Sequence, residues 1–346
     1  MKFAVIGAGF FGLSIAIKIK EKFKSSKVHI FEKENDILLG ASGKNQFRCH
    51  MGYHYPRSEN TIKECKDSFF EFNKYFSNTY LKSNNYYAIA KKNSLTNFEK
   101  YLKILKKNKL KFEIADHALL KKDNIEGLIK ADEKLINIQK VKKKFNKYIK
   151  KNKIEIFFKK NVNPYEDYLK NYDYIFLCTY DNNNNNLKGS TDHKRKFHYQ
   201  LVEKVIVKSP KQYNNNSFVV LDGPFMCIDP YISNNTSILG SVQTSVIAKK
   251  QSIYCNFDKY FRGINSQYTR NIPYLKFPKI KQNFGKFFNG FDKVKYLKSF
   301  IVVRCTVKNE KDERVTVIST KKNVLKVFSG KWVNCMLTAE KLINEL

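Results

Sequence analysis

The sequence predicts an α/β fold in which a helix-flanked parallel sheet is interrupted by a second, strand-rich (α+β) part of the chain. The chain has 346 residues, of which 42% are hydrophobic, so it is long enough to bury the core of two interleaved domains. Two observations carry the prediction. A strand–helix–strand pattern fills residues 2–31, and buried strands return at residues 154–158 and 174–178 after a long insertion.

The first element is an apolar run at residues 2–6, which stops at Gly7 as a buried parallel strand does. Apolar side chains then recur at helical spacing from Leu13 to Phe23. A second β-branched run follows at residues 28–31 and ends at Glu32. This order is typical of a right-handed parallel crossover, the opening unit of a Rossmann-like sheet.

The next element is a long helix between residues 58 and 80. Its apolar side chains recur at steps of three and four, which indicates core packing: Ile62, Cys65, Phe69, Phe72, Phe76 and Tyr80. A strand at 86–90, a helix after Ser94 and an amphipathic helix at 136–151 follow. Beyond residue 188 the pattern predicts six strands and a closing helix, at 201–207, 218–221, 237–242, 300–307, 315–319, 324–328 and 332–346. The asparagine-rich segments near Asn183 and Asn214 are expected to be surface loops.

These elements predict two discontinuous domains. The parallel-sheet domain would take residues 1–80, 136–190 and 311–346, the last with the C-terminal helix. The strand-rich domain would take the insertion at 81–135 and residues 191–310.

The formal net charge is +34, from 65 Lys and Arg against 31 Asp and Glu. Clustered cations bind phosphate backbones, so this excess leaves a nucleic-acid partner open. Lysine is spread over almost every segment, however, and asparagine is abundant as well. The interpretation we favour is a compositional bias with a solvated surface.

Seven cysteines lie far apart, and no CxxC pair occurs. The sequence therefore predicts no metal site. An odd number of cysteines without a secretion signal favours reduced thiols and a cytoplasmic protein. No window reaches the roughly 20 apolar residues of a membrane-spanning helix.

The sharpest motif is Gly7-Ala8-Gly9-Phe10-Phe11-Gly12, between the first strand and the first helix. The first glycine permits the tight turn, the second lets the backbone approach a pyrophosphate, and the third lets helix and strand pack closely. The helix N-terminus supplies amides to a phosphate. Glu32 lies 20 positions after Gly12, where an acid can accept hydrogen bonds from a ribose. Together they predict a dinucleotide site.

The segment after the ribose acid favours FAD over NAD. Residues 40–46 read GASGKNQ, a small and polar turn that suits a loop along an extended cofactor. No second nucleotide fingerprint is found. The parallel-sheet domain is therefore expected to bind FAD.

The chain resembles the D-amino-acid-oxidase-like (DAO) family of FAD-dependent oxidoreductases, which includes glycine oxidase, sarcosine oxidase and 2-hydroxyglutarate oxidase. The matching pieces are GAGFFG at 7–12, FEKE at 31–34, GASGKN at 40–45, HMGYHYP at 50–56, KNV at 160–162, IFLCTY at 175–180 and FSGKW at 328–332. The chain departs from the family at Tyr180, where glycine is usual, and in its closing glycine run, which is reduced to Gly330.

Fingerprint and resemblance together imply a set of cofactor contacts: Gly7, Gly9, Phe10, Phe11, Gly12, Glu32, Lys33, Ser42, Gly43, Asn45, Val162, Thr179, Gly330, Lys331 and Trp332. By resemblance, residues 45–57 would line the reacting face of the flavin. Lys331 would stabilise negative charge on the reduced ring, although capping of the last helix is an alternative role.

Four residues are candidates for the chemistry. His50 and His54 are two of six histidines, and a neutral histidine can accept the proton of a substrate hydroxyl or ammonium. Tyr53 is a candidate for binding a substrate carboxylate, and the guanidinium fork of Arg304 matches its two oxygens. Simple packing remains the alternative for the histidines and the tyrosine. Arg57 is a further candidate for binding the carboxylate, and its alternative is that of a solvated surface arginine.

The expected function is an FAD-dependent oxidoreductase that oxidises a CH–OH or CH–NH bond of a small, anionic amino-acid-like or hydroxy-acid-like molecule. Hydride would pass to flavin N5. Two alternatives stay open. One is a flavoprotein that acts on modified tRNA or other nucleic acid, and the other is an FAD-binding protein without turnover. The electron acceptor is not predicted.

Overall fold

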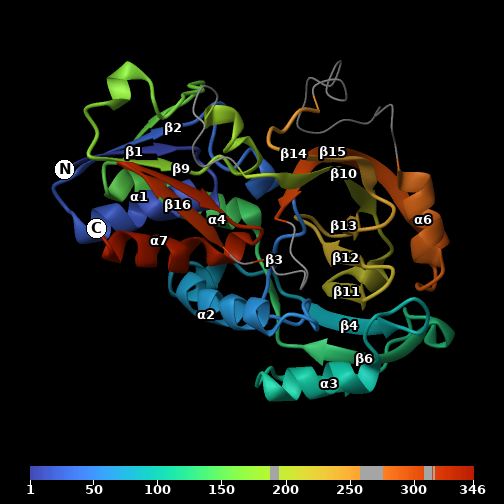
Figure 1. Ribbon diagram of the computed structural model, residues 1–346. Coiled ribbons are helices and arrows are strands. Elements are labelled where there is room, and N and C mark those ends of the chain that lie inside the picture. Colours follow the sequence, from blue (N-terminus) through green and yellow to red (C-terminus); the bar gives the residue numbers. More distant parts are fainter. Residues whose placement is uncertain (188–194, 258–275, 308–313, 315) are drawn as a thin grey trace.

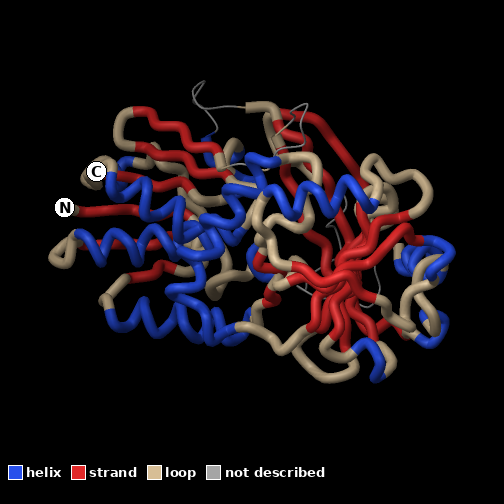
Figure 2. Tube along the Cα trace, turned by 90° about the horizontal axis from the view of Figure 1, so that it is seen from below, coloured by secondary structure: helices blue, strands red, loops and turns tan. Residues whose placement is uncertain are grey.

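The computed structural model describes residues 1–187, 195–257, 276–307, 314 and 316–346. Two sheets form two lobes, and both ends of the chain lie in the lobe of the first sheet (Figure 1). Seen from below, the strands of the second sheet gather apart from those of the first (Figure 2). Each lobe contains its own hydrophobic core.

The first sheet has six strands in the order β16-β17-β9-β1-β2-β8. In that order they are Val317–Lys321, Val324–Phe328, Tyr174–Leu177, Lys2–Ile6, Lys27–Phe31 and Glu155–Phe157. All neighbours are parallel except the edge strand β16. Phe3 to Ile6 of β1 are at most 2% exposed, since helices and loops cover both faces of the sheet.

Four helices pack on this lobe. They are α1 (Phe10–Lys22), α2 (Glu59–Phe76), α4 (Ile138–Lys151) and α7 (Cys335–Asn344). The aromatic side chains predicted to face the core do so, because Phe72 and Phe76 are fully buried in the same cluster as Phe10 and Phe145. The closing segment is a 3-10 turn at Trp332–Asn334 followed by α7, and not one continuous helix.

The second sheet has nine strands, in the order β14-β10-β13-β12-β11-β4-β6-β5, with β15 also paired to β10. In that order they are Val246–Ser252, Phe197–Lys208, Thr236–Ser241, Met226–Pro230, Asn216–Leu221, Asn84–Ala90, Ile125–Ala131 and Phe112–Ala115, and β15 is Lys295–Thr306. Helices α3 (Phe98–Lys107) and α6 (Phe277–Gly285) lie against it. The predicted fold class is confirmed, although the sequence missed β5, β6, β12 and β14. Residue 315, at the start of a predicted strand, lies outside the described residues.

A short two-stranded pairing joins the lobes. β3 (Arg48–Cys49) pairs with β7 (Lys134–Leu135), so the segment after the predicted cofactor loop is tied to the end of the insertion. This pairing fixes where residues 45–57 lie relative to the second sheet.

The asparagine run at 182–186 is not the surface loop that the sequence predicted. Asn183 and Asn184 are completely buried. Asn183 accepts a hydrogen bond from the amide of Thr179 (2.8 Å) and donates to the carbonyl of Val327 (2.8 Å). Asn184 donates to two further backbone carbonyls. Asparagine is buried here because its short amide side chain forms hydrogen bonds with buried backbone N–H and C=O groups.

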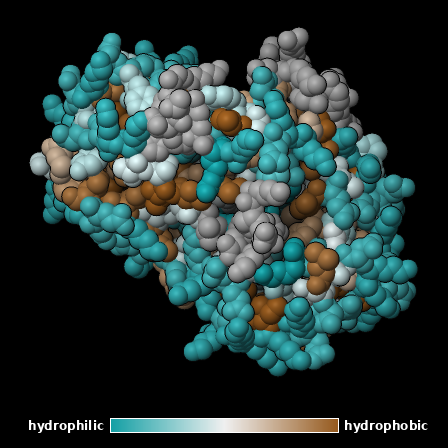
Figure 3. All heavy atoms as spheres, in the orientation of Figure 1, coloured by the Kyte–Doolittle hydropathy of each residue, from teal (hydrophilic) through white to brown (hydrophobic). Residues whose placement is uncertain are grey.

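Figure 3 shows hydrophilic residues spread over most of the visible face of both lobes. Within the described part of the chain, no helix combines the length and the apolar character needed to cross a bilayer.

Candidate active site

The turn after β1 requires glycine at its first and last positions. Gly7 has φ +102°, and a Cβ there would lie 2.8 Å from the carbonyl oxygen of Cys178. A Cβ on Gly12 would overlap the carbonyl oxygen of Gly7. Close packing of β1, β9 and α1 therefore depends on the two glycines, as the fingerprint predicts.

The N-terminus of α1 has the features of an anion site. Gly9 has no side chain to cap the helix, and the first turn contains no acidic residue. The first amide, that of Phe10, donates to Ser42 Oγ (3.1 Å). The positive end of the helix dipole thus meets a hydroxyl from the GASGKN loop, where a phosphate would be stabilised.

Glu32 is fixed at the end of β2. Its Oε2 accepts the amide of Ala8 (2.6 Å), and its Oε1 accepts the amide of Glu34 (2.9 Å). These bonds hold the carboxylate beside the glycine turn, at the carboxyl ends of the parallel strands. This is the position from which an acid can bind a ribose.

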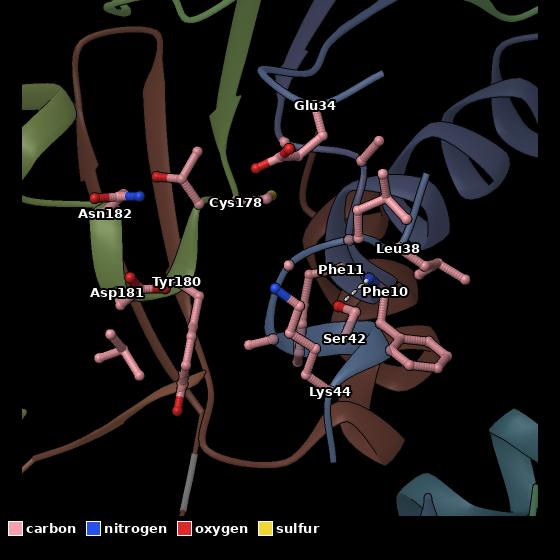
Figure 4. A pocket seen from close by; sticks show the side chains of 18 of the residues that line it. Phe10, Phe11, Glu34, Leu38, Ser42, Lys44, Cys178, Tyr180, Asp181 and Asn182 are labelled. Carbon is pink, nitrogen blue, oxygen red and sulfur yellow. Dashed lines mark hydrogen bonds between the residues drawn. The ribbon is translucent and has the colours of Figure 1, made fainter. Parts of the chain in front are cut away.

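A first cavity of about 360 Å³ opens over this turn. Phe10, Ser42 and Lys44 lie on one side of it and Tyr180, Asp181 and Asn182 on the other (Figure 4). Twelve of the predicted cofactor residues line it: Gly7, Gly9, Phe10, Phe11, Glu32, Lys33, Ser42, Asn45, Val162, Thr179, Gly330 and Trp332. Segments about 320 residues apart in sequence therefore meet at one site.

Three predicted cofactor residues do not line this cavity. Gly12 lies behind the turn, and Gly43 packs against the carbonyl of Leu38. Lys331 faces a second cavity instead. Phe10 borders the first cavity, but its ring is 1% exposed and stacks on Trp332 with centroids 4.9 Å apart.

Sequence reasoning missed the contribution of the second sheet to the first cavity. Val202 and Lys204 of β10 and Val302 of β15 line it. Lys204 Nζ donates to Gln46 Oε1 (2.6 Å), and burial lowers the pKa of Lys204 to about 8. No local motif marks these residues, because the register between β10 and β15 brings them together.

A second cavity of about 440 Å³ adjoins the first. Its lining includes four basic side chains, Arg57, Arg304, Arg314 and Lys331, together with the polar residues His54, Tyr55, Asp222 and Gln243. Tyr180, Arg304 and Gly330 line both cavities, so the two spaces meet at these residues.

Charge in the second cavity is predominantly positive. Arg57 Nε lies 3.2 Å from Asp222 Oδ2. Lys331 Nζ lies 3.8 Å from the centre of the Tyr55 ring, and burial lowers the pKa of Lys331 to about 7. The Tyr55 hydroxyl is buried without a hydrogen-bond partner among the described residues. An anion beside Lys331 and Tyr55 would gain a cation and a hydroxyl donor.

The two predicted histidines lie together, with ring centroids 5.1 Å apart. His54 lines the second cavity and His50 does not; His50 Nδ1 lies 3.7 Å from Glu133 Oε1. Burial lowers the pKa of His50 to about 4 and the pKa of His54 well below its usual value. Both rings are therefore neutral at pH 7, because burial disfavours their protonated form.

The other two predicted catalytic residues differ in their placement. Arg304 lies where the cavities meet, and its Nε donates to Gln200 Oε1 (2.8 Å). Tyr53 lies outside both cavities. It is completely buried, and its hydroxyl donates to the carbonyl of Lys111 (2.5 Å). The next residue, His54, lines the second cavity instead.

Comparison with known proteins decides the family. A family model described as FAD dependent oxidoreductase (DAO) matches residues 2–175, half of the chain. The chain belongs to this family. It is an FAD-dependent oxidoreductase and its cofactor is FAD, which confirms the predicted family, enzyme class and cofactor.

Curated relatives match parts of this oxidoreductase. The FAD-dependent monooxygenase FPY4 of Fusarium mangiferae is 28% identical over 147 residues, which are 42% of this chain and 39% of the relative. The L-2-hydroxyglutarate dehydrogenase of Indibacter alkaliphilus is 31% identical over 67 residues, which are 19% and 17% of the two chains. The matches thus span well under half the length of these relatives.

Solved structures share the fold of the oxidoreductase over nearly its whole length. The L-amino acid deaminase from Proteus vulgaris has a TM-score of 0.72 at 13% identity, covering 100% of this chain and 93% of that one. The glycine oxidase from Geobacillus kaustophilus has a TM-score of 0.69 at 10% identity, covering 99% and 94%.

The residues present fit FAD. The turn has no side chain where a pyrophosphate would approach, and a Cβ on Gly9 would lie 2.9 Å from Ser42 Oγ. Helix α1 offers its N-terminus, and Glu32 is fixed beside the glycine turn, where the fingerprint predicts a ribose contact. The cavity is within the range of roughly 300–1,000 Å³ that is typical of ligand pockets.

Proposed function

We propose that this oxidoreductase oxidises a CH–OH or CH–NH bond of a small anionic molecule, of the amino-acid or hydroxy-acid type, bound in the second cavity. One observation carries the proposal. The cavity built around the dinucleotide turn meets a cation-lined cavity at Tyr180, Arg304 and Gly330. A substrate in the second cavity would therefore lie next to the cofactor.

FAD, when bound, supplies the hydride acceptor at N5. We propose that the chain holds it through the backbone of residues 7–12, the carboxylate of Glu32 and the other predicted residues that line the first cavity. The first-cavity walls from β10 and β15 limit the water that reaches the cofactor, because Val202 and Val302 present apolar side chains there.

The cations position the substrate. Arg304 offers a planar fork that matches a carboxylate, and Lys331 adds a positive charge beside the Tyr55 hydroxyl. Because Arg304 and Lys331 are only half-exposed, their attraction for an anion is stronger than it would be in water. They would fix the reacting C–H bond at the junction of the two cavities.

A neutral histidine takes the proton. Removal of hydride from a CH–OH or CH–NH group leaves a proton on oxygen or nitrogen, which a base within hydrogen-bond reach accepts. His54 lines the cavity, and both it and His50 are neutral. Glu133 Oε1 lies 3.7 Å from His50 Nδ1, so this carboxylate would offset part of the cost that burial imposes on a protonated His50 behind His54.

All seven cysteines carry free thiols, which supports the proposal of a reducing, cytoplasmic location.

Anaerobic reduction of the FAD-loaded protein tests the function. A panel of hydroxy acids, amino acids and their uncharged amides is added, and loss of the oxidised flavin absorbance is followed. At least one acid should reduce the flavin, and its amide should do so at least about tenfold more slowly. Arg304→Met should slow the reaction, while Arg195→Met, at an exposed arginine outside both cavities, should not. Reduction by amides as fast as by acids would contradict the anionic substrate.

A further inference from the structure

Tyr180 holds an uncommon backbone conformation at the junction of the two cavities. It follows β9 and Thr179, and its φ is +54°. Side chains other than glycine, asparagine and aspartate rarely occupy this left-handed region, and a bulky aromatic residue persists there only when its surroundings hold it.

Two contacts hold the side chain. The Tyr180 hydroxyl accepts a hydrogen bond from the amide of Cys305 (2.9 Å) and donates one to the carbonyl of the same residue (3.0 Å). The ring stacks on Phe328, with centroids 5.5 Å apart and planes 4° from parallel. Tyr180 therefore fastens β15 of the second sheet to the ends of β9 and β17 in the first.

The strand that Tyr180 fastens carries Arg304. Cys305 is the next residue in β15, so the two hydrogen bonds fix the backbone directly beside the guanidinium-bearing residue. The Arg304 side chain is held from its other side by Gln200 of β10. Both Tyr180 and Arg304 line both cavities (Tyr180 is labelled in Figure 4).

We propose that Tyr180 is a positioning residue that acts through Arg304: by holding β15 against β9, it fixes the guanidinium where a substrate anion next to the cofactor must bind. This inference rests on the proposed function, because it assumes an anion in the second cavity. Loss of the Tyr180 hydroxyl should therefore weaken the binding of the anion and leave the binding of FAD unchanged.

The test uses benzoate as a small anionic probe and the FAD-loaded protein. The dissociation constant of benzoate is measured from the change that its binding causes in the flavin absorbance. Tyr180→Phe keeps the ring and the stacking and removes only the hydroxyl. Two hydrogen bonds to the backbone are lost, so the dissociation constant should rise roughly 3- to 10-fold. FAD affinity, measured by titrating the apoprotein, should change by less than about twofold.

Tyr213→Phe is the matched control. Tyr213 is also buried and its hydroxyl also donates to a backbone carbonyl, that of Asn289, but it lies outside both cavities. Benzoate affinity should stay unchanged in this variant. Tyr180→Gly is a second variant, which suits the positive φ and removes every contact of the side chain. It should weaken benzoate at least as much as Tyr180→Phe does.

A double-mutant cycle shows whether Tyr180 acts through Arg304. In an Arg304→Met background, Tyr180→Phe should have no further effect on benzoate. An equal loss in both backgrounds, or unchanged affinity in Tyr180→Phe and Tyr180→Gly, would overturn the inference while leaving the proposed function intact. Failure of benzoate and related carboxylates to bind the unmodified protein would overturn the anionic cavity itself, and the inference with it.

Discussion

Arg48 and Glu133 form an ion pair that is closed off from solvent: Arg48 Nη1 lies 3.0 Å from Glu133 Oε2, and the two side chains are 1% and 0% exposed. Arg48 Nη2 also lies 2.6 Å from Asp229 Oδ1. Arg48 lies two residues before His50, Asp229 lies in β12 of the second sheet, and Glu133 lies between β6 of that sheet and β7. The pair therefore anchors the candidate active site to the second sheet.

Arg48→Met should destabilise the protein strongly. The substitution leaves two buried carboxylates without their cation, and the loss of one partner of a buried pair costs about 3–5 kcal/mol. Urea unfolding followed by circular dichroism measures the change. Lys134→Met is the control, because Lys134 pairs with Asp132 at the surface and should contribute at most about 1 kcal/mol. Equal stability losses in the two variants would show that the buried pair has no special role.

Gly9→Val should abolish FAD retention without unfolding the chain. The new side chain would lie against Ser42 Oγ and fill the space in which the pyrophosphate approaches the helix. The flavin released on denaturation, per mole of chain, gives the occupancy. Gly40→Ala is the control, since Gly40 also lines the cavity but a Cβ there meets nothing within 4 Å. Full occupancy in Gly9→Val would mean that the phosphate site is wrongly placed.

Benzoate affinity should fall as pH rises through neutrality. Burial lowers the pKa of Lys331 to about 7, so the ammonium loses its proton between about pH 6 and pH 8 while benzoate stays ionised. Since an anion favours protonated Lys331, the dissociation constant should increase by roughly 5-fold or more from about pH 6 to about pH 9.

Lys331→Met should flatten this pH profile. The histidines do not compete as an explanation, because the pKa of His50 is about 4 and that of His54 is also far below its usual value. A profile that keeps its slope in Lys331→Met would assign the titration to another group.

Asn183→Ala should destabilise the strand ends that surround the cofactor. It removes the acceptor for Thr179 and the donor to Val327, and buried groups left unpaired cost about 1–3 kcal/mol. Urea unfolding measures the loss. Asn78→Ala, at an exposed residue whose side chain accepts a hydrogen bond from the Lys144 ammonium, should have little effect. An Asn183→Ala protein as stable as the Asn78→Ala protein would show that the buried amide network is dispensable.

The sequence could not predict which of two adjacent polar residues lines the cavity, because neighbouring side chains of similar type differ only in how they pack. Tyr53 and His54 are both plausible site residues, yet packing beneath α3 takes Tyr53 into the core, where Tyr101 donates to its carbonyl. The buried asparagines show the same limit. Composition predicts a surface loop at 182–186. In the structure Asn183 is buried instead, because its side-chain amide hydrogen-bonds backbone groups that would otherwise have no partner.

The sequence by itself determined the dinucleotide turn, because the turn and the acid predicted to bind a ribose depend on spacings within about thirty consecutive residues. It also indicated the family, through short motifs that follow one another from residue 7 to residue 332. Only the tertiary structure decided that Tyr180, Arg304 and Gly330 meet and that cations line the adjoining cavity. Those contacts depend on the pairing of β10 with β15 and of β17 with β9. Such long-range register is set by the packing of whole sheets, and no local pattern of residues encodes it.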